Sequence, residues 1–296
     1  MHICIEHSRK AYLPEVHAYS HFFSSKGHQC DVFSNEEADD YDGFDVRWCF
    51  PGISRHRKGE HLLVHDYNSL STGAFPRTKN RIKRLLNTTP DLRIFQNPEC
   101  RNDFAFDDYV PHCFRDMGVS DKFFRCTVTQ EKRYEFVYAG NLGPERRLLP
   151  WLDYFDKSGR KTLLVGAPPV GLFARYRKSN AITFTGPVHY DHVPACLAQA
   201  EYGLNLIPNR YPYPHQASTK LLEYCAMGLK VISTPHEWSV RLFGENDSKF
   251  FRVQFPQDLL SKKLEGFCFS NPDVSEYNWR NVIERSGIEQ MLKKIL

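Results

Sequence analysis

Short apolar runs alternate with longer amphipathic segments in the first half of the chain. A helix is expected over residues 14–26, because a proline opens the segment and Gly27 closes it. A second, basic helix is expected between the last two apolar runs. The runs themselves predict strands at 2–6, 29–34, 46–50, 62–65 and 92–96. This alternation is typical of a parallel sheet with helices on both faces.

The same alternation starts again in the second half, after a polar stretch at 127–133 that we interpret as a link between domains. Strands are expected at 135–139, 162–165, 182–185, 202–207 and 230–233. Helices are expected at 148–156, 193–199 and 219–227, and a polar helix at 275–295 ends the chain. The pattern therefore predicts two α/β domains in one chain.

Composition supports two small domains outside the bilayer. The chain has 296 residues, 41% of them hydrophobic, which can fill two cores. We find no run of 18 apolar residues and no secretory signal at the start. The nine cysteines contain no Cys-x-x-Cys pair. A reducing, cytoplasmic location is therefore expected.

The net charge of +4 is mild, and its densest basic run lies at 77–84. One interpretation of this run is a solvated helix face. The other is contact with anionic lipid heads at the inner membrane face, or with a phosphorylated acceptor. No stripe of charge suited to a duplex is evident, so nucleic acid is not an expected partner.

The most informative segment runs from Ser218 to Thr234. Ser218 and Thr219 can begin a helix whose first amide groups and positive dipole end suit a diphosphate. Glu223, one turn further, could accept hydrogen bonds from ribose hydroxyls. The alternative is an ordinary capped helix that leads through Gly228 into a buried strand.

This segment resembles the donor helix of glycosyltransferase family 4, whose members have the two-domain GT-B fold. The positions that match the family's pattern are Lys220, Glu223, Ala226, Gly228, Val231 and Ile232. The resemblance implies that Glu223 binds the donor ribose. It also places His215 where many members have a glutamate near the transferred sugar. The aromatic loop at 211–215 is expected to line that sugar.

The resemblance extends to the segment at 136–147. In the family a Gly in this loop is followed by two basic residues that neutralise the diphosphate leaving group. Here Gly140 matches, Arg147 stands at the second basic position, Asn141 replaces the first, and Arg146 is a nearby substitute. An arginine pair after a turn can equally be surface charge.

In the first half the resemblance is looser. His65, followed by Asp66, resembles the family's histidine that faces the donor sugar, although a structural histidine at a strand end is the alternative. His7, Ser8 and Arg9 follow the first strand and are expected on the acceptor side. We predict no metal site, because no acidic or cysteine partner accompanies the histidines at a usable spacing.

Together these features predict an α/β protein of the GT-B type, with two Rossmann-like domains facing a central cleft. The expected ranges are 1–130 for the acceptor domain, 131–274 for the nucleotide-sugar domain and 275–296 for a closing helix that crosses back. The resemblance implies a metal-independent, retaining glycosyltransferase, without cofactor, that acts in bacterial O-antigen or capsule synthesis. Its donor would be a nucleotide sugar and its acceptor a glycan or a lipid-linked glycan.

Three other functions stay open on this architecture. An inverting transferase would use His7, His65 or Asp66 as a base. A nucleotide-sugar epimerase would act on the donor alone. A non-catalytic nucleotide- or glycan-binding module would explain why Asn141 and His215 stand at positions that are normally charged. The sequence does not predict the sugar, the base or the oligomeric state.

Overall fold

The computed structural model describes residues 1–8, 12–34, 43–50, 52–54, 59–126, 131–244, 249–259 and 261–296. These residues form two compact units. The first comprises Met1–Gly118, His215–Ala217 and Tyr277–Leu296, and the second comprises Val119–Pro214 and Ser218–Glu276. The expected domain ranges stay predictions, and residues 127–130 of the expected link lie outside the described residues.

The first unit contains a parallel sheet in the order β2-β1-β3-β4-β5-β6. Its strands are β1 (His2–His7), β2 (Gln29–Ser34), β3 (Val46–Cys49), β4 (Leu62–Tyr67), β5 (Leu92–Phe95) and β6 (His112–Phe114). All five predicted strands of this half are confirmed, with small differences at their ends. Strand β6 was not predicted, because three residues are too few to show a periodic pattern.

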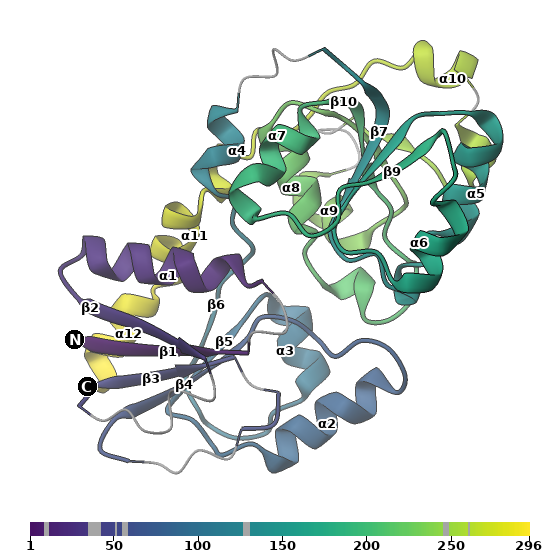
Figure 1. Ribbon diagram of the computed structural model, residues 1–296. Helices are drawn as coiled ribbons and strands as arrows, with labels where there is room; N and C mark the ends of the chain where they lie inside the picture. Colours follow the sequence, from purple (N-terminus) through teal and green to yellow (C-terminus); the bar gives the residue numbers. More distant parts are fainter. Residues whose placement is uncertain are drawn as a thin grey trace. The chain divides into compact units, whose positions relative to one another are not determined.

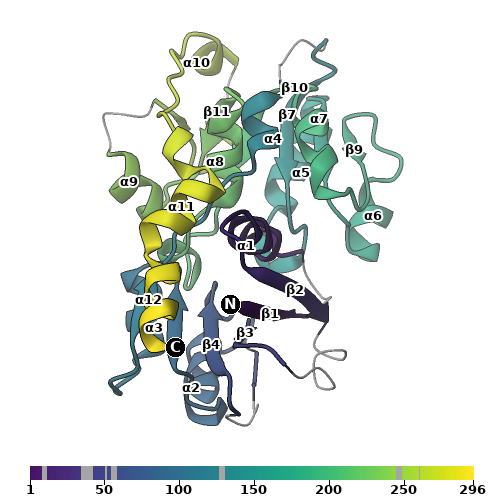
Figure 2. The same cartoon turned by 90° about the vertical axis from the view of Figure 1, so that its left-hand side faces the viewer.

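Helices cover both faces of this sheet. They are α1 (Pro14–Ser25), α2 (Pro76–Leu86), α3 (Pro98–Phe104), α11 (Trp279–Ser286) and α12 (Ile288–Ile295). Within the sheet, the chain steps from β1 toward one edge to form β2, and from β3 toward the other edge to form β4, β5 and β6. Right-handed connections therefore place α1 on one face of the sheet and α2 and α3 on the opposite face (Figure 1). Helix α11 packs against α1, and α12 continues to the C-terminus (Figure 2).

The single helix expected over 275–295 is wrong. After a short turn, two helices meet at Gly287, whose φ of 68° lies in the left-handed region that favours glycine. The glycine therefore ends α11 and redirects the chain. Lys26 pairs with Glu284, and His28 lies 3.3 Å from Glu289, which ties both helices to the end of α1.

The second unit repeats the architecture with a parallel sheet in the order β12-β11-β10-β7-β8-β9. Its strands are β7 (Tyr134–Ala139), β8 (Thr162–Val165), β9 (Ile182–Phe184), β10 (Ala200–Asn205), β11 (Lys230–Ser233) and β12 (Phe251–Arg252). Its helices are α4 (Asp121–Arg125), α5 (Leu149–Ser158), α6 (Val170–Tyr176), α7 (Val193–Leu197), α8 (Thr219–Ala226), α9 (Glu237–Phe243) and α10 (Ser261–Glu265). The predicted strands and helices of this half are confirmed.

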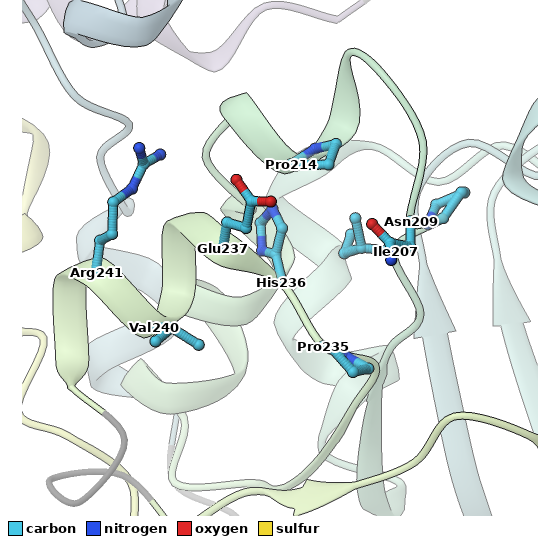
Figure 3. A pocket seen from close by; sticks show the side chains of 9 residues that line it. Ile207, Asn209, Pro214, Pro235, His236, Glu237, Val240 and Arg241 are labelled. Carbon is cyan, nitrogen blue, oxygen red and sulfur yellow. The ribbon is translucent and has the colours of Figure 1, made fainter.

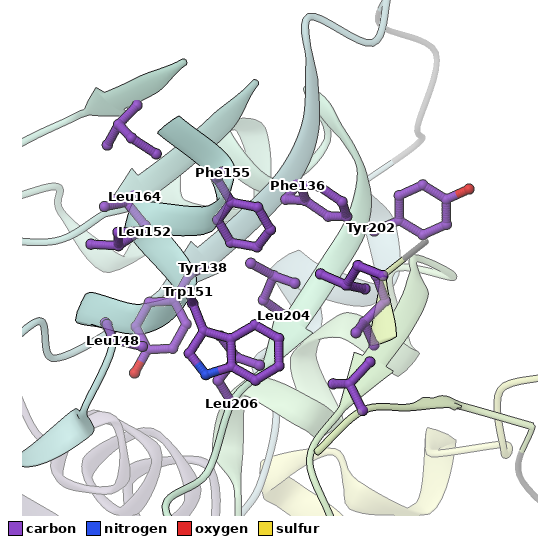
Figure 4. Close-up of a cluster of buried hydrophobic side chains, with 14 of the residues drawn as sticks. Phe136, Tyr138, Leu148, Trp151, Leu152, Phe155, Leu164, Tyr202, Leu204 and Leu206 are labelled. Carbon is purple, nitrogen blue, oxygen red and sulfur yellow. The ribbon is translucent and has the colours of Figure 1, made fainter. Parts of the chain in front are cut away.

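An aromatic core holds α5 to this second sheet. Trp151, Leu152 and Phe155 are buried on one side of the helix, and Phe155 stacks on Phe136 of β7 at 4.8 Å between ring centroids (Figure 4). Burying a side chain of this size contributes about 1.5–3 kcal/mol. The spacing of these residues by one, three and four positions explains why the sequence predicted this helix correctly.

Gly203 in β10 allows α8 to lie close to the sheet. A Cβ atom at this position would come within 2.7 Å of the Tyr224 ring, whose hydroxyl accepts a hydrogen bond from the Ala139 backbone N–H at 3.0 Å. We expect Gly203→Ala to destabilise the protein by about 1–3 kcal/mol in chemical unfolding, because the buried ring must move. Gly171→Ala, where a Cβ atom meets nothing within 4 Å, is the control and should change stability little.

Both sheets contain a point at which the direction of strand order reverses. In the second unit β7 and β10 are neighbours in the sheet. The next strand after β7 in the chain, β8, lies on one side of this pair, and the next strand after β10, β11, lies on the other side. Open α/β sheets bind ligands at the carboxyl ends of strands beside such a point. The loops that follow β7 and β10 are therefore the place to look for a site.

Candidate functional site

Two neighbouring cavities lie at the carboxyl ends of β10 and β11 in the second unit. The first, of about 330 Å³, lies beside α9 and includes His236, Glu237 and Arg241 (Figure 3). The second, of about 190 Å³, is lined by Arg146, Arg147, Trp151, Leu206, Ile207, Pro208, Asn209, Thr234, Pro235 and Gln254. Residues 207–209 line both cavities, so the cavities are adjacent. They lie at the carboxyl edge of the sheet, where the reversal of strand order predicts a site.

A buried polar network fixes the start of helix α8. The Ser218 hydroxyl donates to the Asn205 side-chain oxygen at 2.7 Å, and the Asn205 amide donates to Ser233 Oγ at 2.9 Å. Ser218 therefore occupies the cap position without using its side chain as a cap. Within the described part of the chain, the backbone N–H groups of Thr219 and Lys220 have no acceptor. These two donors and the helix dipole favour an anion here.

Lys220 brings a buried positive charge to the same place. Its stem is partly exposed, but Nζ is buried, has no hydrogen-bond partner and lies 4.0 Å from the centroid of the Tyr138 ring. Burial lowers the pKa of Lys220 well below its usual value, and the Arg146 charge lowers it further. A buried ammonium without an acceptor is costly unless a ligand supplies one.

Arg146 is the second cation of this site, and it is half-buried. Its Nε is buried without a partner, and its guanidinium lies 4.9 Å from the centroid of the Tyr213 ring. The Tyr213 hydroxyl is also buried and unbonded within the described residues. Arg147 differs, because it is exposed and adopts a left-handed φ of 52°. Arg146, which the sequence analysis named as a substitute for the first basic residue, is therefore less exposed than Arg147. Arg147 lies at the rim of the second cavity.

A tight turn after β7 holds Arg146 in place. Gly140 has a φ of 120°, and a Cβ atom there would lie 3.9 Å from the Lys220 stem. The Asn141 side chain accepts from the Gly143 N–H at 2.7 Å and donates to Glu145 at 2.5 Å. Asn141 is therefore engaged within its own loop. Cations beside the turn include Arg146, Arg147, Lys220 and Arg210, which donates to the Glu145 carbonyl at 3.0 Å.

Glu223 is buried one turn along α8. Its Oε1 accepts a hydrogen bond from the Tyr190 hydroxyl at 2.7 Å. Burial raises the pKa of Glu223 to about 7, although Tyr190 and Lys220 oppose the rise. The predicted contact with a ribose would therefore need the other carboxylate oxygen, and it stays a prediction.

His215 belongs to the first unit. Its Nδ1 lies 2.5 Å from an Asp103 carboxylate oxygen, and its backbone carbonyl accepts from the Asn97 side chain at 2.9 Å. Asn97 also caps α3 by accepting from the Cys100 N–H. The structure thus joins His215 to α3, a set of partners that the sequence did not indicate. Its predicted contact with the donor sugar stays a prediction.

In the first unit, His65 and Asp66 lie in β4 and are fully buried. The Tyr67 hydroxyl is 3.4 Å from His65 Nδ1. His7 ends β1 and Ser8 follows it, at this unit's own reversal of strand order, which is a suitable place for a ligand. Arg9 lies outside the described residues. The acceptor-side and catalytic roles of all five residues stay predictions.

Asp66 belongs to a buried ion pair that the sequence did not reveal. Arg115 Nη2 lies 3.2 and 3.3 Å from the two Asp66 oxygens, and its Nε donates to the Tyr19 hydroxyl at 2.7 Å. Tyr19 in turn donates to Asp66 at 2.9 Å. Burial raises the pKa of Asp66 to about 6, although Arg115 opposes the rise. The geometry is that of a structural network.

We expect Arg115→Met to cost about 3–5 kcal/mol at pH 7, because it leaves the Asp66 carboxylate buried without its counter-charge. Urea unfolding would measure the loss. It should shrink at pH 5, where Asp66 becomes protonated. The double variant Asp66→Asn with Arg115→Met should recover most of the loss, whereas equal losses in the two variants would contradict the pairing.

Two negative findings concern the described residues. They contain no group of three or more His, Cys, Asp or Glu side chains arranged to hold a metal ion. None of their helices is long and apolar enough to cross a membrane.

Comparison with known proteins shows the fold. No family model matches the chain, and no curated protein matches it in sequence. It is similar to AviGT4, a glycosyltransferase involved in avilamycin A biosynthesis, with a TM-score of 0.68 at 14% identity over 100% of this chain and 98% of that one. It is also similar to Anabaena HepE, solved with UDP and glucose, with a TM-score of 0.63 at 12% identity over 100% and 97% of the two chains.

A third similar structure is phage T4 BGT with UDP-glucose, with a TM-score of 0.58 at 15% identity over 100% of this chain and 99% of that one. These are GT-B glycosyltransferases, and the likeness extends over whole chains. The predicted fold class is therefore confirmed: the chain has the GT-B fold, with two Rossmann-like units. The narrower resemblance to glycosyltransferase family 4 stays a prediction.

Tyr138, Tyr190 and Tyr213 are the site residues that the sequence analysis missed. Tyr138 lies under Lys220, Tyr190 bonds to Glu223, and Tyr213 lies against Arg146. Tyr213 belongs to the aromatic loop that we expected to line a sugar. These three tyrosines give only a weak signal in sequence, because tyrosine is common in α/β cores.

Proposed function

We propose that this protein is a glycosyltransferase that moves a sugar from a nucleoside-diphosphate sugar to a hydroxyl group of an acceptor. One observation carries the proposal. Among the described residues, two buried nitrogens without hydrogen-bond partners, Lys220 Nζ and Arg146 Nε, lie at the carboxyl edge of the second sheet, where α8 begins without a side-chain cap. The GT-B fold and the UDP-containing structures of similar proteins support it.

In this proposal the cations act on the leaving group. The bond between the anomeric carbon and a phosphate oxygen breaks, and the diphosphate leaves with the electron pair. A bond forms between the anomeric carbon and the acceptor oxygen, whose proton is lost to a base. Lys220, Arg146 and the Thr219 and Lys220 N–H groups would stabilise the departing charge, with Arg147 at the rim. Glu223 would bind the ribose beside Tyr190.

This arrangement supports chemistry without a metal ion. Arginine, lysine and a helix amino end can together neutralise a diphosphate that would otherwise need a divalent cation. We also propose retention of configuration and an acceptor that is a glycan or a lipid-linked glycan of bacterial surface polysaccharide. Those two statements rest on the resemblance described above and on the GT-B fold.

The test is a screen of nucleoside diphosphates by thermal shift, followed by turnover assays with the corresponding nucleotide sugars. Stabilisation by a nucleoside diphosphate and release of that diphosphate from its sugar, in the presence of a chelator, would support the proposal. No stabilisation by any diphosphate would contradict it. Loss of turnover with the chelator would contradict the metal-free mechanism alone.

A non-catalytic nucleotide-binding module is the second candidate function. It is favoured by the complete burial of His65 and the enclosure of Asp66 by Arg115 and Tyr19, since both were expected to face substrate. Tight binding of a nucleoside diphosphate without turnover of any nucleotide sugar would support it.

A further inference from the structure

Helix α2 shows the reverse of the usual pattern for a helix in a globular protein. A surface helix normally buries its apolar side chains against the core. In α2 the one buried side chain is that of Asn80, which accepts from the Ser71 N–H at 3.0 Å. The apolar residues face outward: Phe75 at the helix start is 80% exposed and Leu85 is 72% exposed, and Ile82 and Leu86 are exposed as well.

Three of these apolar side chains form one stripe. Ile82, Leu85 and Leu86 are spaced by three and four residues and lie on one side of the helix. Phe75 immediately precedes the helix and has a left-handed φ of 50°, so it lies outside the helical repeat and adds a separate exposed apolar side chain at the amino end of α2. An exposed apolar stripe of this kind requires a partner or an apolar phase.

Basic residues lie on both sides of the stripe. At 100° per residue, Lys79 and Lys83 lie on one side and Arg77 and Arg81 on the other. Helix α2 contains no acidic residue. At the far end of the helix, Arg84 lies 4.0 Å from Asp107. The helix therefore presents an apolar centre between two positive borders.

We propose that this face of α2, formed by Phe75, Ile82, Leu85 and Leu86 with Arg77, Lys79, Arg81 and Lys83, docks on an anionic lipid bilayer. The stripe enters the boundary between head groups and acyl chains, and the basic borders contact the lipid phosphates. At 11 residues the helix is about 16 Å long, which suits a helix lying flat in the interface. The inference stands independently of the proposed function.

Two other occupants fit the surface less well. A second copy of the chain, placed face to face by two-fold symmetry, would bring the basic borders of both helices together at a repulsive distance. A nucleic acid would satisfy the basic residues, but its phosphate backbone would leave Leu85 and Phe75 exposed to water. An anionic bilayer satisfies both the charge and the apolar stripe.

Vesicle flotation of the full chain tests the proposal. The vesicles are phosphatidylcholine alone, or phosphatidylcholine with about one-third phosphatidylglycerol. We expect binding to the anionic vesicles that weakens with added salt. Leu85→Ser should weaken it about tenfold, and Arg77→Gln with Arg81→Gln should weaken it about fivefold for each charge removed. Unchanged melting curves would show that the variants remain folded.

Matched controls lie in the second unit. Val170 on α6 is 87% exposed, and Val170→Ser removes an apolar side chain of similar exposure. Arg177→Gln with Lys178→Gln removes two exposed charges. Both controls should float like the unmodified protein. Absence of binding to anionic vesicles, or binding that Leu85→Ser leaves unchanged, would overturn the proposal. Binding to duplex DNA that is equally strong and insensitive to Leu85→Ser would overturn it in favour of nucleic acid.

Discussion

Replacing Lys220 with methionine should make the free protein more stable and its binding of a nucleoside diphosphate much weaker. Among the described residues, Lys220 Nζ is buried over the Tyr138 ring without a hydrogen-bond acceptor, and burial lowers its pKa, so folding costs free energy whether the amine stays charged or loses its proton. Methionine has a similar length and no charge, and we expect a gain of about 1 kcal/mol or more in unfolding free energy. Loss of a charged hydrogen bond to the phosphate should weaken binding of UDP by roughly 10-fold to 100-fold.

Melting curves with and without UDP measure both effects in one experiment. Lys178→Met, at an exposed position in the same unit, is the matched control and should change neither quantity. A structural role for Lys220 predicts the opposite sign, a less stable free protein with an unchanged ligand-induced shift. That result would remove Lys220 from the binding site.

Replacing Glu223 with glutamine should flatten the dependence of stability on pH. Burial raises the pKa of Glu223 from 4.5 to about 7, so the folded protein holds a proton that the unfolded chain releases. The resulting stabilisation is fully present below pH 4.5 and is lost as pH rises through 7. A shift of this size corresponds to about 3 kcal/mol. Glutamine does not ionise and should retain the stability at pH 8.

Urea unfolding between pH 5 and pH 8 would measure this difference. Burial also raises the pKa values of Asp66 and Asp116 to about 6, so their ionisation likewise lowers the stability of the folded protein as pH rises. Their effect ends at a lower pH, whereas the lowered pKa of Lys220 acts in the opposite direction, so above pH 6.5 the difference between the curves of Glu223→Gln and the unmodified protein reports on Glu223. Asp116→Asn is the control, and it should leave the slope in that interval unchanged. Parallel curves for Glu223→Gln and the unmodified protein would contradict the burial of an ionisable Glu223.

Much of the fold could be predicted because the chain repeats one simple pattern. Strands such as β8 and β11 are short apolar runs between turn residues, and their predicted ends agree with the structure. Helix α5 has apolar residues at helical spacing. The elements that were missed are short: β6, α6 and α9 have three to seven residues, which is too few for a period to show. Gly287 was visible in the sequence, and a left-handed helix end there could have been predicted.

The site could be predicted only in part, because partners in space leave little trace in sequence. The helix motif correctly predicted the helix that carries Lys220 and Glu223, whereas their roles in binding stay predictions. It could not indicate that Tyr190 would bond to Glu223, 33 residues earlier in the chain. Nor could it indicate that Arg146 would be less exposed than Arg147, since that difference follows from the left-handed backbone at Arg147.

The central claim is that Lys220, Arg146 and the amino end of α8 bind the diphosphate of a nucleotide. Calorimetric titration of the unmodified protein with the nucleoside diphosphate that stabilises it most, with the corresponding monophosphate and with the nucleoside tests it most directly. A second phosphate adds at least one charged contact with these groups, so the diphosphate should bind roughly 10-fold to 100-fold more tightly than the monophosphate, and the nucleoside more weakly still. If the diphosphate and the monophosphate bound equally, or if no diphosphate bound, the site would not recognise a diphosphate and the account would be wrong.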